Sequence, residues 1–415
     1  MTKPTQIVVG IDVGTSKIVT MVAGFTSDNA PWVNVLGVAS APANGIKSGQ
    51  IVDINSAVTV INASLEAAER MAGHSASHAV VSISGKHIES QNSRGVVAVS
   101  SPEREISQND ITRVLEAAKA ISLPTAREVI HVIPRMFIVD GQEGIKDPIG
   151  MTGVRLEVDT HIVSANSTAL NNLVKAIEEV GVDVDDVIFS GYGSSLAVLS
   201  TTEKDLGVVL VDIGAGTTDI CIFIEGSLSY SSVLPIGARH ISNDLAIGLR
   251  ISFESAEKIK LFLTPKKSKT VLTPEVLAEK EEKTAKEVDE IDLAALGMAE
   301  EIRKVSKKTL IEGIIKPRLN EIFTMVGLEI KKSGFGGQTP SGVVLTGGGA
   351  LTVGAPEAAK KMLSMPVRVA VPQEMNGLID EIEHPSFATA VGLVKYAGME
   401  IDEQAGLPFG LAMPK

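Results

Sequence analysis

The sequence predicts an α/β fold built from two related halves, and two observations lead to this prediction. The first is a repeat: segments 10–17 and 211–219 each join two apolar strands through a turn rich in Gly, Thr and Ser. Asp12 and Asp212 occupy the same place in the two segments, 200 residues apart, which indicates two related domains rather than a short-period solenoid. The second is that strand and helix patterns are mixed along the whole chain.

Length and composition are those of a globular protein with a substantial core. The chain has 415 residues and a mass of 43.5 kDa, enough for about two to four folding units. Apolar residues make up 44 % and charged residues 21 %, which argues against disorder. Because 38 basic residues face 50 acidic ones, the net charge is -12, and we expect no nucleic-acid partner.

Cysteine usage and hydropathy predict an intracellular protein. One cysteine, Cys221, excludes an intramolecular disulfide and a multi-cysteine zinc site, and its apolar neighbours predict a buried side chain. No stretch approaches the ~18 apolar residues of a membrane span. The N-terminal apolar run stops at Asp12 and is too short for a signal peptide.

Between the two repeated segments, local patterns predict individual strands and helices. Short strands are expected at 80–83 and 96–99. Ser107 and Asp110 have the spacing of a capping box, and they introduce a helix whose apolar residues share one face. A second amphipathic helix is expected at 170–180, ended by glycine.

The second half contains a charged segment and a third glycine loop. Residues 264–308 carry dense charge of both signs, which predicts a solvated helical hairpin or a mobile insertion. A helical pattern at 322–330 and a glycine-rich linker at 334–337 lead to a strand at 343–345. Directly after it comes the loop 346–350, with three successive glycines.

The repeated turns suggest a phosphate-binding site. Backbone N–H groups in a tight glycine turn can cradle an anion, and glycine lets the backbone approach phosphate oxygens. Asp12 and Asp212 would face the phosphates of a nucleotide held between the turns, which implies Mg²⁺ held through water. Each turn alone would be an ordinary β-turn, so the prediction depends on the pair. The side chains expected to assist are Thr15, Ser16, Lys17, Thr217 and Thr218.

Two further features could contact the rest of such a ligand. Gly347, Gly348 and Gly349 leave room for a flat group against the backbone, or they form an ordinary flexible turn. Glu257 and Lys260 are three residues apart on one helical face, where they could contact a ribose or a base. The alternative for this pair is a surface ion pair.

The order of these motifs resembles the superfamily of actin, heat-shock chaperones and sugar kinases. Within it, the chain is more similar to the FtsA family of bacterial division proteins. Four segments support the closer resemblance: 81–88, 131–134, 142–148 and 150–155. They lie where FtsA proteins have a subdomain 1C instead of the subdomain 1B of actin. The resemblance extends from about residue 7 to residue 397.

This resemblance implies an actin-like two-domain ATPase fold, with duplicated ribonuclease-H-like domains and an FtsA-type subdomain 1C. The expected divisions are 1–84 and 164–205 for subdomain 1A, 85–163 for 1C, 206–250 and 339–397 for 2A with a return helix, 251–338 for 2B, and 398–415 for a flexible C-terminal tail.

The resemblance also implies ATP and Mg²⁺ as ligands and assigns the site residues. The first phosphate loop would be Asp12, Gly14, Thr15, Ser16 and Lys17, and the second Asp212, Gly214, Gly216, Thr217 and Thr218. Glu257 and Lys260 would contact the adenosine, beside Gly347, Gly348 and Gly349. A cationic patch of Arg303, Lys307, Lys308 and Arg318 in 2B would bind the C-terminal tail of FtsZ, unless it is simply a solvated helix face.

Family membership would make this protein a cell division adaptor. Such proteins polymerise, bind the FtsZ tail and link the Z ring to the inner face of the cytoplasmic membrane at the division site. Subdomain 1C would contact neighbouring subunits and other division proteins.

Two departures from the expected pattern matter. Hydrolysing relatives of the superfamily place Glu or Gln in the segment that corresponds to 187–195, which has neither here. We therefore expect at most a slow ATPase. Family members end in an amphipathic membrane helix, whereas Gly and Pro interrupt residues 403–415. We expect that this tail, as written, binds membranes weakly, so that an anchor was removed or attachment differs.

Two alternatives from the same superfamily remain open at this point. A metabolite kinase would need a base beside an acceptor hydroxyl, and residues 84–163 show no clear pocket for one. A PilM-type pilus-assembly adaptor would bind a peptide of the pilus machinery instead of the FtsZ tail.

Overall fold

The computed structural model describes residues 6–25, 33–101, 103–264, 289–292 and 304–404. Its first half is a six-stranded sheet with the strand order β11-β6-β1-β2-β3-β19. The apolar repeat forms the β1–β2 hairpin, whose register runs from the pair Gln6–Phe25 to Val13–Ile18. The strands are β1 (Gln6–Val13), β2 (Lys17–Phe25), β3 (Val33–Pro42), β6 (His78–Ile83), β11 (Asp183–Phe189) and β19 (Met375–Gly377).

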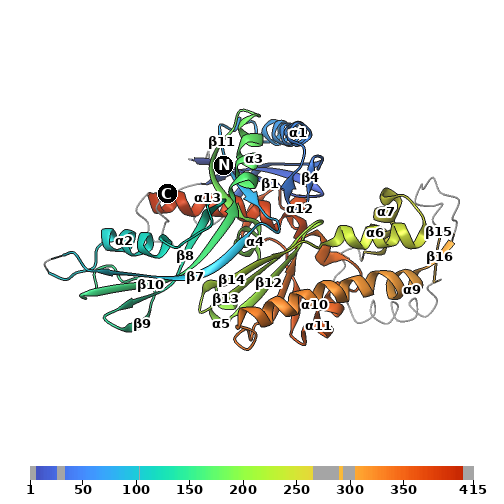
Figure 1. Cartoon of the computed structure of the whole chain (residues 1–415). Helices are drawn as coiled ribbons and strands as arrows, with labels where there is room; N and C mark the ends of the chain where they lie inside the picture. Colours follow the sequence, from blue (N-terminus) through green and yellow to red (C-terminus); the bar gives the residue numbers. More distant parts are fainter. Residues whose placement is uncertain (1–5, 26–32, 102, 265–288, 293–303, 405–415) are drawn as a thin grey trace.

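Helices cover both faces of this sheet (Figure 1). On one face lie α1 (Ile54–Ala72) and α3 (Ser167–Glu178), and on the other α4 (Ser190–Val198) and α13 (Ala388–Gln404). Asp53 caps the N-terminus of α1 by accepting from Ser56 N–H at 3.2 Å. Two short strands, β4 (Ile46–Lys47) and β5 (Gln50–Ile51), pair beside α1.

The second half repeats the plan of the first in a five-stranded sheet, ordered β14-β13-β12-β17-β18. The β12–β13 hairpin pairs from Val208–Phe223 to Ile213–Thr218, and β17 lies parallel to β12, as β6 lies parallel to β1. Cys221 is fully buried in this sheet, as its neighbours predict. The elements are β12 (Val208–Ile213), β13 (Thr218–Ile224), β14 (Ser227–Leu234), β17 (Val343–Thr346), β18 (Val367–Val369), α5 (Thr201–Leu206) and α11 (Ala355–Leu363).

A smaller α/β unit is inserted between β6 and α3 and has its own apolar core. It contains the sheet β7-β10-β8-β9 with α2 packed on it. Ser107 and Asp110 form the predicted capping box at the start of α2. The bounds are β7 (Glu89–Ala98), α2 (Gln108–Lys119), β8 (Arg127–Val139), β9 (Gln142–Ile145) and β10 (Arg155–Asn166).

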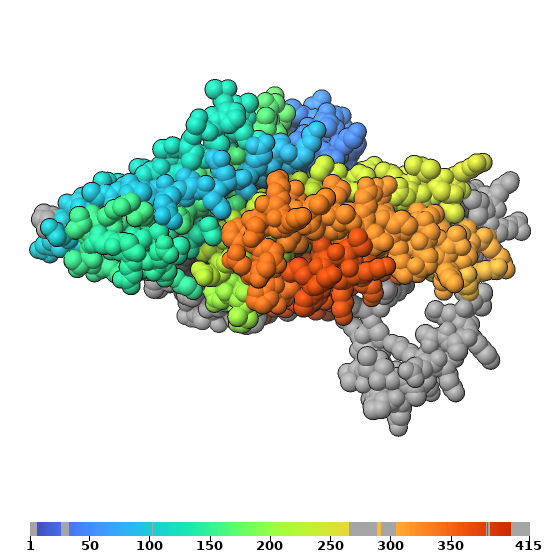
Figure 2. Space-filling model, turned by 60° about the horizontal axis from the view of Figure 1, so that its bottom comes forward, coloured from blue at the N-terminus to red at the C-terminus, as the bar shows by residue number. Residues whose placement is uncertain are grey.

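At the opposite end of the molecule, helices extend from the second sheet (Figures 1 and 2). The short π-helix η2 precedes α10, where Pro317 has no N–H to donate to the carbonyl of Gly313, so the regular α-helical hydrogen bond cannot form there. Residues 265–288 and 293–303 of the charged segment lie outside the described residues. The elements are α6 (Ala238–Leu249), α7 (Phe253–Leu263), β15 (Glu290–Asp292), β16 (Lys304–Ser306), α9 (Lys307–Leu310), η2 (Ile311–Ile315) and α10 (Lys316–Ser333).

The chain returns to the first half through η3 (Gly348–Leu351), α12 (Ile379–Ile382) and η4 (Pro385–Phe387), which precedes α13. Helix α13 continues through residues 398–404, where the sequence predicted a flexible tail, and residues 405–415 lie outside the described part. None of the helices in the described ranges is both long and apolar enough to span a bilayer.

Candidate functional site

The two repeated turns face each other across a cleft between the halves. Gly14 is required in the first turn, because a Cβ there would lie 2.7 Å from the carbonyl oxygen of Lys17. In the second turn Gly214 N–H donates to the carbonyl of Thr217 at 2.9 Å. Gly216 touches the first turn, since a Cβ on it would lie 2.8 Å from Oγ1 of Thr15. The two turns thus meet at Gly216, and Gly14 keeps the first turn tight.

The third glycine loop closes the cleft from the side of the second sheet. Gly347 has φ 80°, and a Cβ on it would lie 2.1 Å from Oδ1 of Asp212. A Cβ on Gly349 would lie 2.4 Å from Cγ2 of Ile213. Close packing of this loop against the second turn therefore depends on glycine, and the loop is not an ordinary flexible turn.

These elements enclose a cavity of about 660 Å³. Two of the predicted residues, Gly216 and Thr218, do not line it. Thr218 is fully buried and donates its hydroxyl to the carbonyl of Ile236 at 2.8 Å, so that hydroxyl is committed within the fold. The predicted residues that do line the cavity are Asp12, Gly14, Thr15, Ser16, Lys17, Asp212, Gly214, Thr217, Glu257, Lys260, Gly347, Gly348 and Gly349.

Asp12 and Asp212 are each held by hydroxyl groups. Ser82 donates to Oδ1 of Asp12 at 2.7 Å, and burial raises the pKa of this carboxyl. Ser194 donates to Oδ2 of Asp212, and Thr389 donates to the same oxygen at 3.5 Å. Burial, together with the charge of Asp12, raises the pKa of Asp212 to about 6.

A third carboxylate, Asp219, was not predicted as part of the site. It accepts a hydrogen bond from Ser84 at 2.6 Å, and both residues line the cavity. Burial and then the charge of Asp212 raise the pKa of Asp219 well above its usual range. The sequence did offer a clue, because Asp219 is the last residue of the second repeated segment.

The donor set suits a hydrated magnesium ion accompanied by phosphate oxygens. Three carboxylates near one cavity oppose each other's ionisation, and a divalent cation would relieve that cost. Within the described ranges, no three His, Cys, Asp or Glu side chains converge closely enough to hold a metal by themselves. A magnesium ion at these carboxylates would be held through water, and this part of the sequence-based expectation stays a prediction.

Lys17 is one of two lysines on the cavity wall, the other being Lys260. The Lys17 ammonium donates to Oγ of Ser386 at 3.0 Å and lies 3.6 Å from the ring centre of Phe387. Burial lowers the pKa of Lys17 to about 8, partly offset by the charge of Asp12. No sequence motif indicated Ser386 or Phe387, because they lie about 370 residues from Lys17 in a segment without a recognisable pattern.

Glu257 and Lys260 form an ion pair, but the pair lines the cavity instead of the outer surface. Lys260 is 7 % exposed and donates to Glu257 at 2.8 Å, to Ser242 at 2.9 Å and to the carbonyl of Ala238 at 3.3 Å. All three ammonium hydrogens are thus used within the protein. Glu257 also accepts from the Ser242 hydroxyl and remains partly exposed to the cavity.

The predicted cationic patch is only partly available. Arg318 on α10 holds Asp244 on α6 through two hydrogen bonds of 2.5 and 2.8 Å, and it also donates to Glu321 at 2.5 Å. Lys307 and Lys308 lie at the start of α9, and neither ammonium forms an ion pair with the described residues. Arg303 lies outside those residues.

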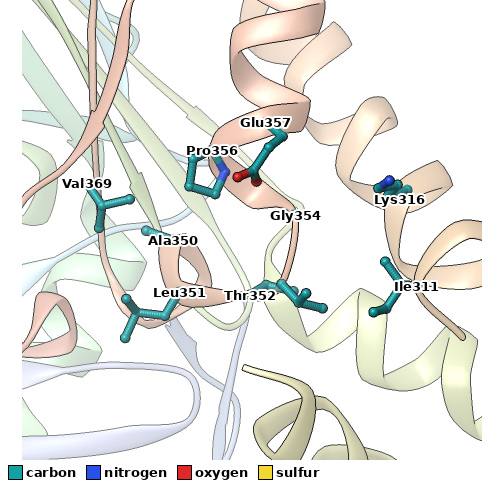
Figure 3. Close-up of a pocket in the computed structure, with 10 residues that line it drawn as sticks. Ile311, Lys316, Ala350, Leu351, Thr352, Gly354, Pro356, Glu357 and Val369 are labelled. Carbon is teal, nitrogen blue, oxygen red and sulfur yellow. The ribbon is translucent and has the colours of Figure 1, made fainter. Parts of the chain in front are cut away.

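A second, smaller cavity of about 410 Å³ lies beside the first, between α11 and the start of α10 (Figure 3). Leu351 and Thr352 line both cavities. The Oγ1 atom of Thr352 is buried without a hydrogen-bond partner in the described part of the chain. Lys316 and Glu357 contribute the charged groups of an otherwise largely apolar lining.

Two halves that each begin with a glycine-turn hairpin and enclose a cavity between them define an actin-like ATPase fold. Comparison with solved structures supports this class. The PilM–PilN type IV pilus biogenesis complex matches with a TM-score of 0.63 at 14 % identity, covering 94 % of this chain and 98 % of that one. MreB5 of Spiroplasma citri bound to ADP matches with a TM-score of 0.53 at 12 % identity, covering 97 % and 99 %.

The particular family is defined by sequence. The chain belongs to the FtsA family of cell division proteins. Residues 85–164 match the family profile "SHS2 domain inserted in FTSA", and residues 209–392 match "Cell division protein FtsA". FtsA of Pseudomonas aeruginosa is 38 % identical over 94 % of this chain and 89 % of its own length, and FtsA of Bacillus subtilis is 35 % identical over 99 % and 87 %. The predicted family and fold class are therefore confirmed.

Proposed function

We propose that this protein binds Mg²⁺–ATP in the cavity between its halves and acts as an adaptor of the division machinery. The observation that carries the proposal is the enclosure of one cavity by two facing glycine turns, a third glycine loop, three carboxylates and Lys17. Glycine backbone and Lys17 suit the phosphates, the carboxylates suit hydrated Mg²⁺, and the loop 347–349 with Glu257 suits the adenosine.

Calorimetry with ATP, in the presence of Mg²⁺ and in its absence, tests this proposal. We expect binding that Mg²⁺ strengthens. Asp183→Asn should bind ATP as the unmodified protein does, because Asp183 is an exposed carboxylate that does not line the cavity. It is the control for variants of the cavity carboxylates. Failure of the unmodified protein to bind ATP under either condition would overturn the assignment of the cavity.

The adaptor role has two further parts, a partner and an assembly. The start of α9, with Lys307 and Lys308, suits the C-terminal peptide of FtsZ, whose relevant groups would be carboxylates. Self-association into filaments would place many copies along the Z ring. The inserted unit that matches the SHS2 profile (residues 85–164, called the SHS2 unit below) would contact neighbouring copies and other division proteins. Fluorescence anisotropy with the FtsZ peptide and sedimentation with Mg²⁺–ATP test the two parts separately.

The membrane link is the remaining part of the proposal. The site of action would be the inner face of the cytoplasmic membrane at the division septum. Co-sedimentation with anionic liposomes tests whether the chain as written attaches by itself, and a version with a basic amphipathic helix appended after Lys415 is the comparison. We expect weak attachment of the former and strong attachment of the latter.

A further inference from the structure

A fourth segment, 384–389, contacts all three glycine loops of the cavity. Ser386 accepts from Lys17 of the first loop. The carbonyl of Pro385 accepts from N–H of Gly347 in the third loop at 3.2 Å. Thr389, in the first turn of α13, donates to Asp212 before the second loop at 3.5 Å. One continuous stretch of chain therefore touches each part of the proposed phosphate site, although none of the sequence motifs includes it.

Hydrogen bonding fixes which way the hydroxyl of Ser386 points. Backbone N–H of Ser386 donates to Nδ1 of His384 at 3.2 Å, so Nδ1 carries no proton. The Ser386 hydroxyl, 2.8 Å from the same nitrogen, must then donate to it. Its oxygen lone pairs are left to accept from Lys17, so the three groups form a chain that runs from Lys17 through Ser386 to His384.

This arrangement holds the Lys17 ammonium while leaving donors for a ligand. An ammonium has three N–H groups, and Ser386 is its one hydrogen-bond acceptor within the described chain. The face of Phe387 adds a cation–π contact from another side. Two N–H groups are left for an anion in the cavity.

The same contacts keep Lys17 away from Asp12. Each would attract the other, yet no ion pair within 4.0 Å joins them in the described structure. A lysine free to rotate could fold onto that carboxylate and neutralise it, which would remove one partner of a magnesium ion and one partner of phosphate at once. Ser386 and Phe387 oppose the movement of the ammonium toward Asp12, because they hold it through a hydrogen bond and a cation–π contact.

We propose that Ser386 and Phe387 are positioning residues that aim the Lys17 ammonium at the phosphate end of a nucleotide. The inference rests on the proposed function, because it assumes that the ligand carries phosphate. It predicts an effect confined to ligands with phosphate groups, since Lys17 would be displaced from the phosphate end while the nucleoside part of the cavity stays intact.

Calorimetry with Mg²⁺–ATP, Mg²⁺–ADP and adenosine tests the proposal on four proteins: wild type, Ser386→Ala, Ser386→Thr and Phe387→Leu. Loss of one hydrogen bond predicts about 2- to 10-fold weaker binding of ATP and ADP by Ser386→Ala, with adenosine unchanged. Ser386→Thr keeps the hydroxyl and should restore most of the affinity. Phe387→Leu should weaken the phosphate ligands in the same selective way.

A double-mutant cycle with Lys17→Met tests whether Ser386 affects ATP affinity through the Lys17 ammonium. Ser386→Ala should cause no further loss of ATP affinity once the ammonium is gone. Thr112→Ala, on a half-buried helix position in the inserted unit (residues 85–164) away from the cavity, is the matched hydroxyl control. Equal weakening of adenosine and ATP, or an undiminished effect of Ser386→Ala in Lys17→Met, would overturn the proposal. If wild type binds no nucleotide, the proposed function fails instead.

Discussion

The hydroxyl of Ser84 donates a 2.6 Å hydrogen bond to Oδ1 of Asp219, and this bond joins the two halves of the molecule at the cavity. Ser84 follows β6 in the first half, and Asp219 lies on β13 in the second. The contact between Gly216 and Thr15 lies nearby. A ligand that changes the spacing of the two halves at the cavity would therefore act on the contact between Ser84 and Asp219.

Slow ATP hydrolysis is the first prediction. The segment 187–195 forms the end of β11 and the start of α4, and it contains neither Glu nor Gln. Its Ser194 is committed to Asp212, and the hydroxyl that it brings to the cavity wall, that of Ser190, is a weaker base than a carboxylate. Asp219 is the carboxylate beside the cavity that we propose for orienting a water. We expect phosphate release well below ~1 s⁻¹, and a further decrease in Asp219→Asn. A faster turnover of the wild type, measured by phosphate release, would contradict the prediction.

The second prediction concerns the metal. Asp212→Asn removes a negative charge next to the proposed magnesium position while preserving the shape of the side chain. Affinity for ATP should fall clearly in the presence of Mg²⁺ and change little in EDTA, because only the metal-bound ligand uses the carboxylate. Calorimetry under the two conditions measures the difference. The role of Asp212 would be refuted by the same affinity in wild type and variant with Mg²⁺ present.

How much of this site the sequence could predict depends on whether residues that meet in space also share a local pattern. Asp12 and Asp212 were predictable, because strong turn motifs between apolar strands are a local property and the motif occurs twice. The exception within the motifs is Thr218, whose place on β13 directs its hydroxyl to Ile236 instead of the cavity. Successive side chains of a strand point to opposite faces, so a shift of one residue decides whether a side chain faces the cavity or the core.

Ser84, Ser194 and Ser386 could not be predicted as site residues. Each is a serine in an ordinary sequence context, brought into hydrogen-bond contact with a residue of the site by the packing of distant elements. The fold was easier to predict, because two repeated hairpins and regular helix patterns constrain the topology. The continuation of α13 through 398–404 was missed, because a helical pattern that fades in the sequence leaves the end of a helix uncertain by several residues.

The third prediction separates the members of the cationic patch. Charge reversal at Lys307 and Lys308 should weaken binding of the FtsZ peptide, because these lysines would pair with its carboxylates, and added salt should reduce the difference. Within the described residues the charge of both lysines acts on the exposed carboxylate of Asp289. Charge reversal at Arg318 would instead break its bonds to Asp244 and destabilise the contact of α6 with α10. Its effect on binding would therefore come with a lower melting temperature.

Anisotropy and thermal melting on the same samples make this distinction measurable. The double variant of Lys307 and Lys308 should lose affinity without losing stability, whereas the Arg318 variant should lose stability. Lys175→Glu, on an exposed position of α3, controls for net charge. An unchanged affinity after reversal of both lysines would exclude the start of α9 as the peptide site.

The last prediction concerns His161, which connects the SHS2 unit to the second half. Its Nδ1 bonds to Oδ1 of Asn92 at 2.7 Å and its Nε2 to Oγ of Ser231 at 2.9 Å. Burial, followed by the charge of Arg135, lowers the pKa of His161 to about 3. The unfolded chain binds a proton near pH 6.5 and the folded chain does not, so stability falls as the pH drops below 6.5.

The size of this effect follows from the difference between the two pKa values. From pH 7.5 to pH 5.0, His161 should lower the free energy of unfolding by about 2 kcal/mol, because 1.5 pH units lie below the unfolded value of about 6.5. His161→Gln keeps polar contacts but cannot titrate, so urea unfolding at both pH values should show a smaller loss on acidification. His74→Gln, at an exposed histidine, is the matched control for the replacement of histidine by glutamine. If His161→Gln loses as much stability as wild type between the two pH values, His161 is not the group that titrates on unfolding.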